Sequence, residues 1–223
     1  MLNTDMAAYY AKRAATHEED YAKPEWQHDL AVVRNWIHAQ VAHRHVLELG
    51  CGTGYWTAEV AQVAASVLAT DRSDPMIDRA KSKNLAAGKV SFALADAFDI
   101  TIDQLAVPLD AVNAVNAIFA AGWWSHVLRE EQDRLLTRLR QQVAQDTLLV
   151  LVDHVYVEGS STSIARTDLQ GNTFQIRTLD GERFEILKNF PSDSALRKRF
   201  AAHLKDIRIQ RLEHFWMMSG RLR

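Results

Sequence analysis

The chain has 223 residues, of which 48% are apolar and 24% are charged, a composition typical of one globular α/β domain with an insertion. Its formal net charge is −2 and its sequence pI is about 6.5, so the chain has no excess of positive charge to attract a phosphate backbone. Nucleic acid is therefore not an expected partner. No apolar run approaches the roughly 18 residues of a membrane span, and the single cysteine, Cys51, excludes an intrachain disulfide. These features predict a cytoplasmic protein with no membrane partner.

The N-terminal part is predicted to form a helical cap. Residues 1–28 are polar and aromatic, and from Glu25 to Ala42 the apolar residues fall at three- and four-residue spacing. That spacing is typical of a helix with one buried face. We expect residues 1–42 to cap a single domain that spans residues 1–223.

From His45 onward, short apolar runs alternate with helical patterns. The runs are predicted to be strands over His45–Leu49, Val67–Thr70, Val90–Leu94, part of Ala111–Phe119, and Leu148–Val155. Helices are predicted between them over Tyr55–Ala65, after a cap at Ser73 or Asp74, and over Arg129–Gln145. Continuous apolar strands that alternate with helices are typical of a mostly parallel sheet covered on both faces.

The chain changes character after Val157. Residues 158–190 are rich in Gly, Ser, Thr and charge, and the turn Asp180-Gly181 is flanked by predicted strands over Thr173–Arg177 and Arg183–Leu187. This pattern predicts a β-hairpin insertion, which we expect to act as a lid. A helix is predicted over Ser192–Leu204, and two strands over Ile207–Gln210 and Glu213–Ser219 close the chain.

The most informative stretch is a glycine-rich turn between the first of these strands and its helix. Residues 46–56 read VLELGCGTGYW. Glycine lets the backbone turn tightly and lets a ligand approach the main chain, and the first turn of a helix presents free N–H groups. Asp71 ends the next strand about 20 residues later, where an acidic side chain can meet a ribose hydroxyl.

Three details favour S-adenosylmethionine (SAM) over a dinucleotide as the ligand of this turn. The third glycine of a dinucleotide motif is replaced by Tyr55, and that glycine normally permits close packing beside a pyrophosphate. The carboxylate of Glu48 would repel a pyrophosphate but suits a ligand that carries an ammonium and a sulfonium. No lysine or arginine lies in the turn to neutralise phosphate.

The segment Glu48–Gly54 resembles motif I of the class I SAM-dependent methyltransferases. Downstream segments such as Trp123–Val127 and Tyr156–Thr162 resemble those of a bacterial, small-molecule branch. The resemblance continues through Asp71, Met76 and Asp96-Ala97 and covers about residues 9 to 219. It implies an α/β fold of the Rossmann-like, doubly wound type, with a seven-stranded, mostly parallel sheet whose last strand is antiparallel. It also implies SAM as cofactor and S-adenosylhomocysteine (SAH) as product.

The resemblance also implies a set of cofactor-binding residues. The backbone at Gly50 and Gly52 would hold the methionine part of SAM, with Glu48 near its ammonium, and Asp71 would bind the ribose hydroxyls. Met76 would pack on the adenine, while Asp96 and the Ala97 N–H would bind the adenine edge. The full set expected to bind the cofactor is Tyr21, Glu48, Gly50, Cys51, Gly52, Tyr55, Trp56, Asp71, Arg72, Met76, Asp96 and Ala97.

Some of these residues have simpler explanations when taken alone. Asp71 could cap a helix, Met76 could belong to the core, and Cys51 could be a small residue in the turn. The joint placement of Glu48, Asp71 and Asp96 carries the inference. N-terminal tyrosines, Tyr9, Tyr10 or Tyr21, are expected to close over the cofactor.

Aromatic and histidine side chains follow the fourth and fifth strands, at the edge of a parallel sheet where ligands bind. The candidate acceptor pocket consists of Trp123, Trp124, His126, His154 and Tyr156. Aromatic packing against the next helix is the alternative explanation. We predict from these residues a pocket for an apolar or aromatic molecule.

His126 is the candidate general base, because an imidazole titrates near neutrality. An amine or an already ionised acceptor would need no base. Asp153 and His154 are adjacent in a strand and should face opposite ways. No recognised ligand spacing surrounds them, so no metal site is expected.

We therefore predict an enzyme that transfers a methyl group from SAM to a hydroxyl or nitrogen of a small, apolar or aromatic molecule. Residues 119–124 read FAAGWW and lack the Asn/Asp-Pro-Pro-Tyr/Phe pattern of methyltransferases that act on exocyclic amines of DNA. Two alternatives stay open: a non-catalytic module that binds SAM or SAH, and an NAD(P)-dependent oxidoreductase. The protein is expected to be a monomer or a homodimer.

Overall fold

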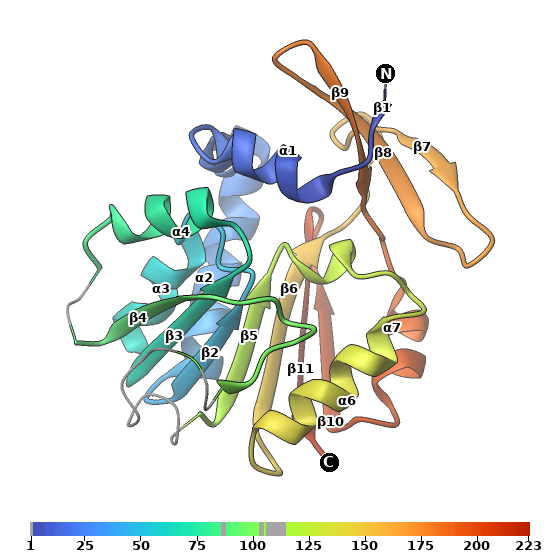
Figure 1. Ribbon diagram of the computed structural model, residues 1–223. Helices are drawn as coiled ribbons and strands as arrows, with labels where there is room; N and C mark the ends of the chain where they lie inside the picture. The colour runs from blue at the N-terminus through green and yellow to red at the C-terminus, as the bar shows by residue number, and fades with distance from the viewer. Residues whose placement is uncertain (1, 86–87, 103–104, 106–114) are drawn as a thin grey trace.

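The computed structural model describes residues 2–85, 88–102, 105 and 115–223. Its main feature is a seven-stranded sheet in the order β10-β11-β6-β5-β2-β3-β4 (Figure 1). The strands are β2 (His45–Leu49), β3 (Ser66–Asp71), β4 (Val90–Leu94), β5 (Ala117–Ala121), β6 (Leu148–His154), β10 (Leu204–Arg211) and β11 (Phe215–Leu222). β2 to β6 pair in parallel, and β11 runs antiparallel to both of its neighbours. The expected doubly wound fold with an antiparallel last strand is confirmed.

Helices cover both faces of this sheet, as Figure 1 shows. One face packs against α2 (Gln27–Val41), α3 (Tyr55–Val63) and α4 (Asp74–Lys81), and the other packs against α6 (Gln132–Gln142) and α7 (Asp193–Phe200). Side chains of a strand alternate between faces, so Val46 joins the first core while Leu47 and Leu49 join the second. The continuous apolar character of the strands is explained by burial on both sides.

A second, four-stranded sheet lies over the carboxyl ends of the parallel strands (Figure 1). It has the order β1-β9-β8-β7, with β1 (Leu2–Asn3), β7 (Ile164–Thr167), β8 (Thr173–Leu179) and β9 (Glu182–Leu187). The predicted hairpin is present as β8 and β9, which pair antiparallel. The sheet contains more strands than the predicted hairpin, because β7 pairs with β8 and the N-terminal β1 pairs in parallel with β9.

The N-terminal segment joins the two sheets. Helix α1 (Met6–Arg13) is capped by the Asp5 carboxylate, and two 3-10 turns follow, η1 (His17–Ala22) and η2 (Pro24–Trp26). The ring of Tyr9 packs on Phe184 of β9, with 5.3 Å between the centroids. Helix α1 is thereby held between the small sheet and the large one (Figure 1).

Several predicted boundaries differ from the structure. The helix predicted from Glu25 begins at Gln27, after the 3-10 turn that Pro24 opens. The helix predicted over Arg129–Gln145 spans only Gln132–Gln142, because Val143 has extended backbone. The fourth strand is Ala117–Ala121, and the predicted residues 111–114 lie outside those the structure describes.

Two features are absent from the residues that the structure describes, a membrane-spanning helix and a cluster of metal ligands. None of their helices combines the length and apolarity required to cross a bilayer. No group of three or more His, Cys, Asp or Glu residues in the described ranges is arranged to hold a metal ion.

Candidate active site

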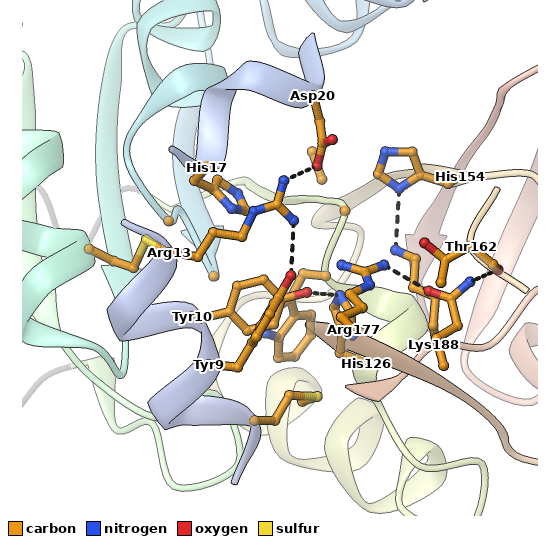
Figure 2. Close-up of a pocket in the computed structure, with 18 of the residues that line it drawn as sticks. Tyr9, Tyr10, Arg13, His17, Asp20, His126, His154, Thr162, Arg177 and Lys188 are labelled. Carbon is orange, nitrogen blue, oxygen red and sulfur yellow. Dashed lines mark hydrogen bonds and ion pairs between the residues drawn. The ribbon is translucent and has the colours of Figure 1, made fainter. Parts of the chain in front are cut away.

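The carboxyl ends of the parallel strands open into a cavity of about 600 Å³, which α1 and the small sheet cover. Figure 2 shows how side chains from both sheets and from the N-terminal segment converge on it. One end of the cavity is formed by the glycine turn after β2 and by residues that follow β3 and β4. The other end is formed by residues of β6, β8 and the segment after β9.

The three glycines of the turn differ in what a side chain at each position would contact. Gly50 has a φ of +63°, and a Cβ there would lie 2.2 Å from Cδ1 of Trp123. Gly54 has a φ of +79°, and its Cβ would lie 3.0 Å from that of Ala80 in α4. At Gly52, with a φ of +55°, the nearest atom to a Cβ is the His17 ring at 3.7 Å. The outer glycines therefore permit packing, and the middle one leaves backbone open to the cavity.

Asp71 lies at the end of β3 and holds this turn in place. One of its carboxylate oxygens accepts from the Gly52 N–H at 2.9 Å, and the other accepts from the Ser73 N–H at 2.9 Å. Burial raises the pKa of Asp71, although these two hydrogen bonds oppose the shift. Asp71 also lines the cavity, so it combines a structural role with an acceptor position facing a ligand.

Most of the predicted cofactor-binding residues line one continuous wall of the cavity. These residues are Tyr21, Gly50, Gly52, Asp71, Arg72, Met76, Asp96 and Ala97. Arg72 and Asp96 face each other across this wall, with 3.7 Å between Nη1 and Oδ2. The structure therefore brings together groups that are separated by up to three strands in the sequence.

Four predicted cofactor-binding residues are not among those that line the cavity. Tyr55 stacks on Tyr21 with 3.9 Å between ring centroids, and the Trp56 Nε1–H donates to the Tyr21 hydroxyl at 2.9 Å. These two rings support Tyr21 rather than face the cavity. Cys51 is buried in the turn, where burial raises the pKa of its thiol. Glu48 is the fourth.

Glu48 is buried on the α3 face of β2, with 2% of its surface exposed. Its Oε2 has no hydrogen-bond partner among the described residues. Burial, with a smaller contribution from the Asp71 charge, raises the pKa of Glu48 to about 7. A buried carboxyl without a partner fits a site that a cationic group completes.

The N-terminal segment is docked directly on the glycine turn. The Thr53 hydroxyl donates to Glu18 at 2.5 Å, and Lys83 after α4 forms an ion pair with the same carboxylate at 2.6 Å. The His17 ring lies beside Gly52. Sequence analysis missed Glu18 and His17 because η1 carries no periodic apolar pattern that fixes its position.

At the acceptor end, the structure separates the five predicted pocket residues. Trp123, His126 and His154 line the cavity. Trp124 is buried and packs on Phe200 of α7 with 4.8 Å between centroids, so the packing alternative is correct for this residue. Tyr156 packs on Phe190 at 5.3 Å and is likewise not among the lining residues.

His126 has one defined tautomer in this arrangement. Its Nδ1 lies 2.5 Å from the Leu187 carbonyl oxygen, which can only accept, so Nδ1 carries the proton. Its Nε2 therefore accepts from the Tyr10 hydroxyl at 2.8 Å. Burial, and then the nearby Lys188 cation, lower the pKa of His126, while burial raises the pKa of Tyr10 to about 12. Both groups are neutral near pH 7, and α1 supplies the group that occupies the histidine lone pair.

A buried charged cluster beside His126 is absent from the sequence prediction. Lys188 is 5% exposed, and its ammonium donates to the Ser125 hydroxyl at 2.7 Å and to the fully buried Asp153 at 3.0 Å. It also lies 3.2 Å from Nδ1 of His154. His154 lines the cavity and Asp153 does not, but the two side chains do not point apart as expected, because Oδ1 of Asp153 lies 3.2 Å from Nδ1 of His154. Burial opposes ionisation of Asp153, but the Lys188 charge and the hydrogen bond with His154, with smaller contributions from both histidines, together hold the pKa of that carboxyl well below its usual range.

Arg177 of β8 lines the same end of the cavity, and Figure 2 shows its side chain close to those of His126 and Lys188. Its Nη2 donates to Oε1 of Gln175 at 2.8 Å, and Gln175 in turn donates to the Thr162 carbonyl at 2.6 Å. Sequence analysis missed Arg177 and Lys188 because an arginine and a lysine in a polar hairpin are usually solvated. Only the docking of the small sheet turns them inward.

Three comparisons with known proteins bear on this geometry. A family model described as a methyltransferase domain matches residues 46–146. A solved structure, the DhpI–SAH complex, covers 97% of this chain and 94% of its own, with 27% identity and a TM-score of 0.76. The chain is a SAM-dependent methyltransferase with the class I fold. A second DhpI structure, the DhpI–SAM–HEP complex, superposes on this methyltransferase with a TM-score of 0.71 at 27% identity and covers 96% of this chain and 94% of its own.

Two curated relatives match shorter stretches of this methyltransferase. Magnesium-protoporphyrin O-methyltransferase of Rhodobacter capsulatus is 43% identical over 61 residues, which span 26% of this chain and 27% of the relative. Phosphoethanolamine N-methyltransferase 1 of Zea mays is 31% identical over 96 residues, 43% of this chain and 18% of the relative. The family model includes the glycine turn and His126 but ends before His154, Arg177 and Lys188. The end of the cavity formed by β6, β8 and the segment after β9 thus lies largely outside what the family model describes.

Proposed function

We propose that this methyltransferase transfers a methyl group from SAM to a small-molecule acceptor bound at the far end of the same cavity. The observation that carries the proposal is that one cavity of about 600 Å³ joins the glycine turn to the His126 and His154 wall. The DhpI structures, which are complexes with SAH and with SAM, support SAM as the cofactor. The acceptor atom expected from the sequence is a hydroxyl oxygen or a nitrogen.

The residues of the cofactor wall fit SAM. The open backbone at Gly52 would hold the methionine part, Asp71 would accept from ribose hydroxyls, and Met76 would pack on the adenine. Asp96 and the Ala97 N–H would bind the adenine edge. When bound, SAM supplies an activated methyl group on a sulfonium, so the protein's tasks are orientation and exclusion of water.

Exclusion of water is the role we assign to the N-terminal segment and the small sheet. Residues 1–42 and 158–190 would together cover the site of one domain, since α1 and β9 pack on each other above the cavity. The Glu18 contacts to Thr53 and Lys83 would fix this cover on the cofactor end.

A hydroxyl acceptor would use His126 as its base through Tyr10. The acceptor proton would pass to the Tyr10 oxygen while the Tyr10 proton passes to Nε2 of His126, which leaves tyrosine neutral and histidine protonated. The lowered pKa of His126 keeps the ring neutral at pH 7, so Nε2 has a lone pair for the proton, but the same shift makes the ring a weaker base than a free imidazole. The apolar or aromatic acceptor expected from the sequence has little support from this wall, because Lys188 and Arg177 line it.

A non-catalytic module that binds SAM or SAH is the second candidate, since the cofactor wall would serve both functions. Its hallmark would be SAH binding without turnover of any acceptor. The open cavity end beyond the glycine turn favours the enzyme, because a sensor has no need for a second compartment.

Calorimetric titration of the purified protein with SAH tests the proposal. We expect binding in the micromolar range that is lost in Asp71→Ala, because the substitution removes both the loop hydrogen bonds and the ribose acceptor. Asp78→Ala, at an exposed position of α4, is the control and should bind as the wild type does. An absence of heat and of thermal stabilisation at saturating SAH in the wild type would refute the cofactor assignment.

A further inference from the structure

The acceptor end of the cavity carries positive charge from two elements. Arg177 lies on β8, and Lys188 follows β9, so both are delivered by the small sheet onto the end of β6 (Figure 2). His126 and His154 line the same wall from below. Burial lowers the pKa of both histidines, with a further contribution from Lys188, so near pH 7 the charge of this wall resides on the arginine and the lysine.

The cations around the cavity differ in how they are compensated. Arg13 is paired with Asp20, Arg72 faces Asp96, and Lys188 is paired with Asp153. Arg177 has no carboxylate within the 4.0 Å of an ion pair among the residues that the structure describes. Its side chain is half-buried. Withdrawal of a guanidinium from water without a counter-charge is unfavourable, so the site favours a ligand that brings the negative charge.

Arg177 is also held in a fixed orientation. Gln175 is 1% exposed, and its amide nitrogen is committed to the Thr162 carbonyl. Its amide oxygen therefore points to Arg177 and accepts one N–H of the guanidinium. Arginine carries five N–H donors in a rigid fork, and Nε has no partner among the described residues. A guanidinium with free donors matches the paired oxygens of an oxyanion.

We propose that the methyl acceptor is a small oxyanion, with a carboxylate or a phosphoryl-type group bound by the Arg177 guanidinium and with Lys188 alongside. This inference rests on the proposed function, since it assigns the acceptor of the same cavity. Asp153 balances Lys188 from behind the wall, so the charge left for the ligand is that of Arg177. The Thr162–Gln175–Arg177 chain of hydrogen bonds sets the position of the group that recognises it.

The test uses the full-length protein saturated with SAH and two probes, inorganic phosphate and acetate. Binding is followed by calorimetry and by the fluorescence of Trp26 and Trp123, which line the cavity. We expect at least one probe to bind and Arg177→Met to weaken it by about tenfold or more, because a charge-assisted hydrogen bond is lost. Arg177→Lys should retain part of the affinity. Phosphate binding alone would assign a phosphoryl-type acceptor, and acetate binding alone a carboxylate.

The matched control is Arg183→Met, an exposed arginine on the neighbouring strand. It should bind the probe as the wild type does, and the SAH affinity of all three variants should stay within about twofold of the wild type. The inference is overturned if neither probe binds while SAH does, or if Arg183→Met weakens the probe as much as Arg177→Met. A wild type that does not bind SAH would refute the proposed function instead.

Discussion

At the scale of single residues, the site depends on side chains whose burial changes their chemistry. The glycine turn is an example of steric necessity, since Trp123 occupies the space in which a Cβ of Gly50 would lie. Glu48 is an example of electrostatic cost, since a carboxylate without a partner is unfavourable in the core. The buried Glu48 carboxylate therefore lowers the stability of the folded protein when no cationic ligand is bound.

Glu48 gives a prediction on stability against pH. Its pKa is about 7 in the folded protein and about 4.5 in the unfolded chain, so the folded state binds the proton more tightly. The contribution of Glu48 to stability is then fully present below about pH 4.5 and is lost as pH rises through about 7. The loss should reach roughly 3 kcal/mol at pH 8.

Urea unfolding of the wild type and of Glu48→Gln between pH 5 and pH 8 measures this contribution. The variant remains neutral at every pH. The difference between its free energy of unfolding and that of the wild type should therefore shift in favour of the variant as pH rises. Glu19→Gln, at an exposed position in η1, should show no such gain. A difference between Glu48→Gln and wild type that stays constant with pH would show that the carboxyl is not buried as described.

At the scale of elements, the N-terminal segment contacts the cofactor end through its 3-10 turn η1. In this turn Glu18 accepts from Thr53 and pairs with Lys83, and the Tyr21 ring stacks on Tyr55. The other end of the segment, β1, is only two residues long and pairs with β9. Local opening of a fold begins where contacts are fewest, so loss of the Glu18 contacts should loosen the segment over the glycine turn.

We therefore predict that Glu18→Ala weakens SAH binding by several-fold, on the order of 1 kcal/mol, without loss of fold. The substitution frees the segment that covers Gly52, so SAH should dissociate faster. Stopped-flow fluorescence of the bound state measures the dissociation rate. Glu19→Ala is the matched control, and an unchanged dissociation rate in Glu18→Ala would mean that the segment does not retain the ligand.

At the scale of the whole molecule, the small sheet and the large one share elements from both ends of the sequence. β1 and α1 come from the N-terminus, whereas β7, β8 and β9 come from residues 164–187. The two parts meet in the packing of Tyr9 on Phe184. This interdigitation supports the single domain expected for residues 1–223.

A single domain should unfold in one cooperative step. We predict one calorimetric transition, with an enthalpy that agrees between calorimetric and van't Hoff analysis. SAH at about 100 times its dissociation constant should raise the free energy of unfolding by about 2.7 kcal/mol and shift the whole transition upward. Two transitions, of which SAH moves only one, would show that the small sheet folds separately.

The sequence by itself determined the fold class and predicted a set of cofactor-binding residues, most of which line one cavity. The reason is that the glycine turn, Asp71 and Asp96 each lie at or directly after the carboxyl end of a strand. In a parallel sheet these ends all lie at the same edge. A local pattern then suffices to place them together. The limits of the pattern are visible at Tyr55 and Trp56, which lie next to the turn in sequence but face the other way, toward Tyr21.

Only the tertiary structure decided the acceptor end. Trp124 and Tyr156 are predicted to line the pocket but pack against other side chains. Arg177 and Lys188 are expected to be solvated but line the cavity, and Tyr10, expected only to close over the cofactor, contacts His126. Their positions depend on how the hairpin and the N-terminal helix dock on the large sheet. The residues brought together in this way can be more than a hundred positions apart in the sequence, as Tyr10 and His126 are. No local periodicity encodes that docking, because it is set by the burial of a few side chains such as Tyr9 and Phe184.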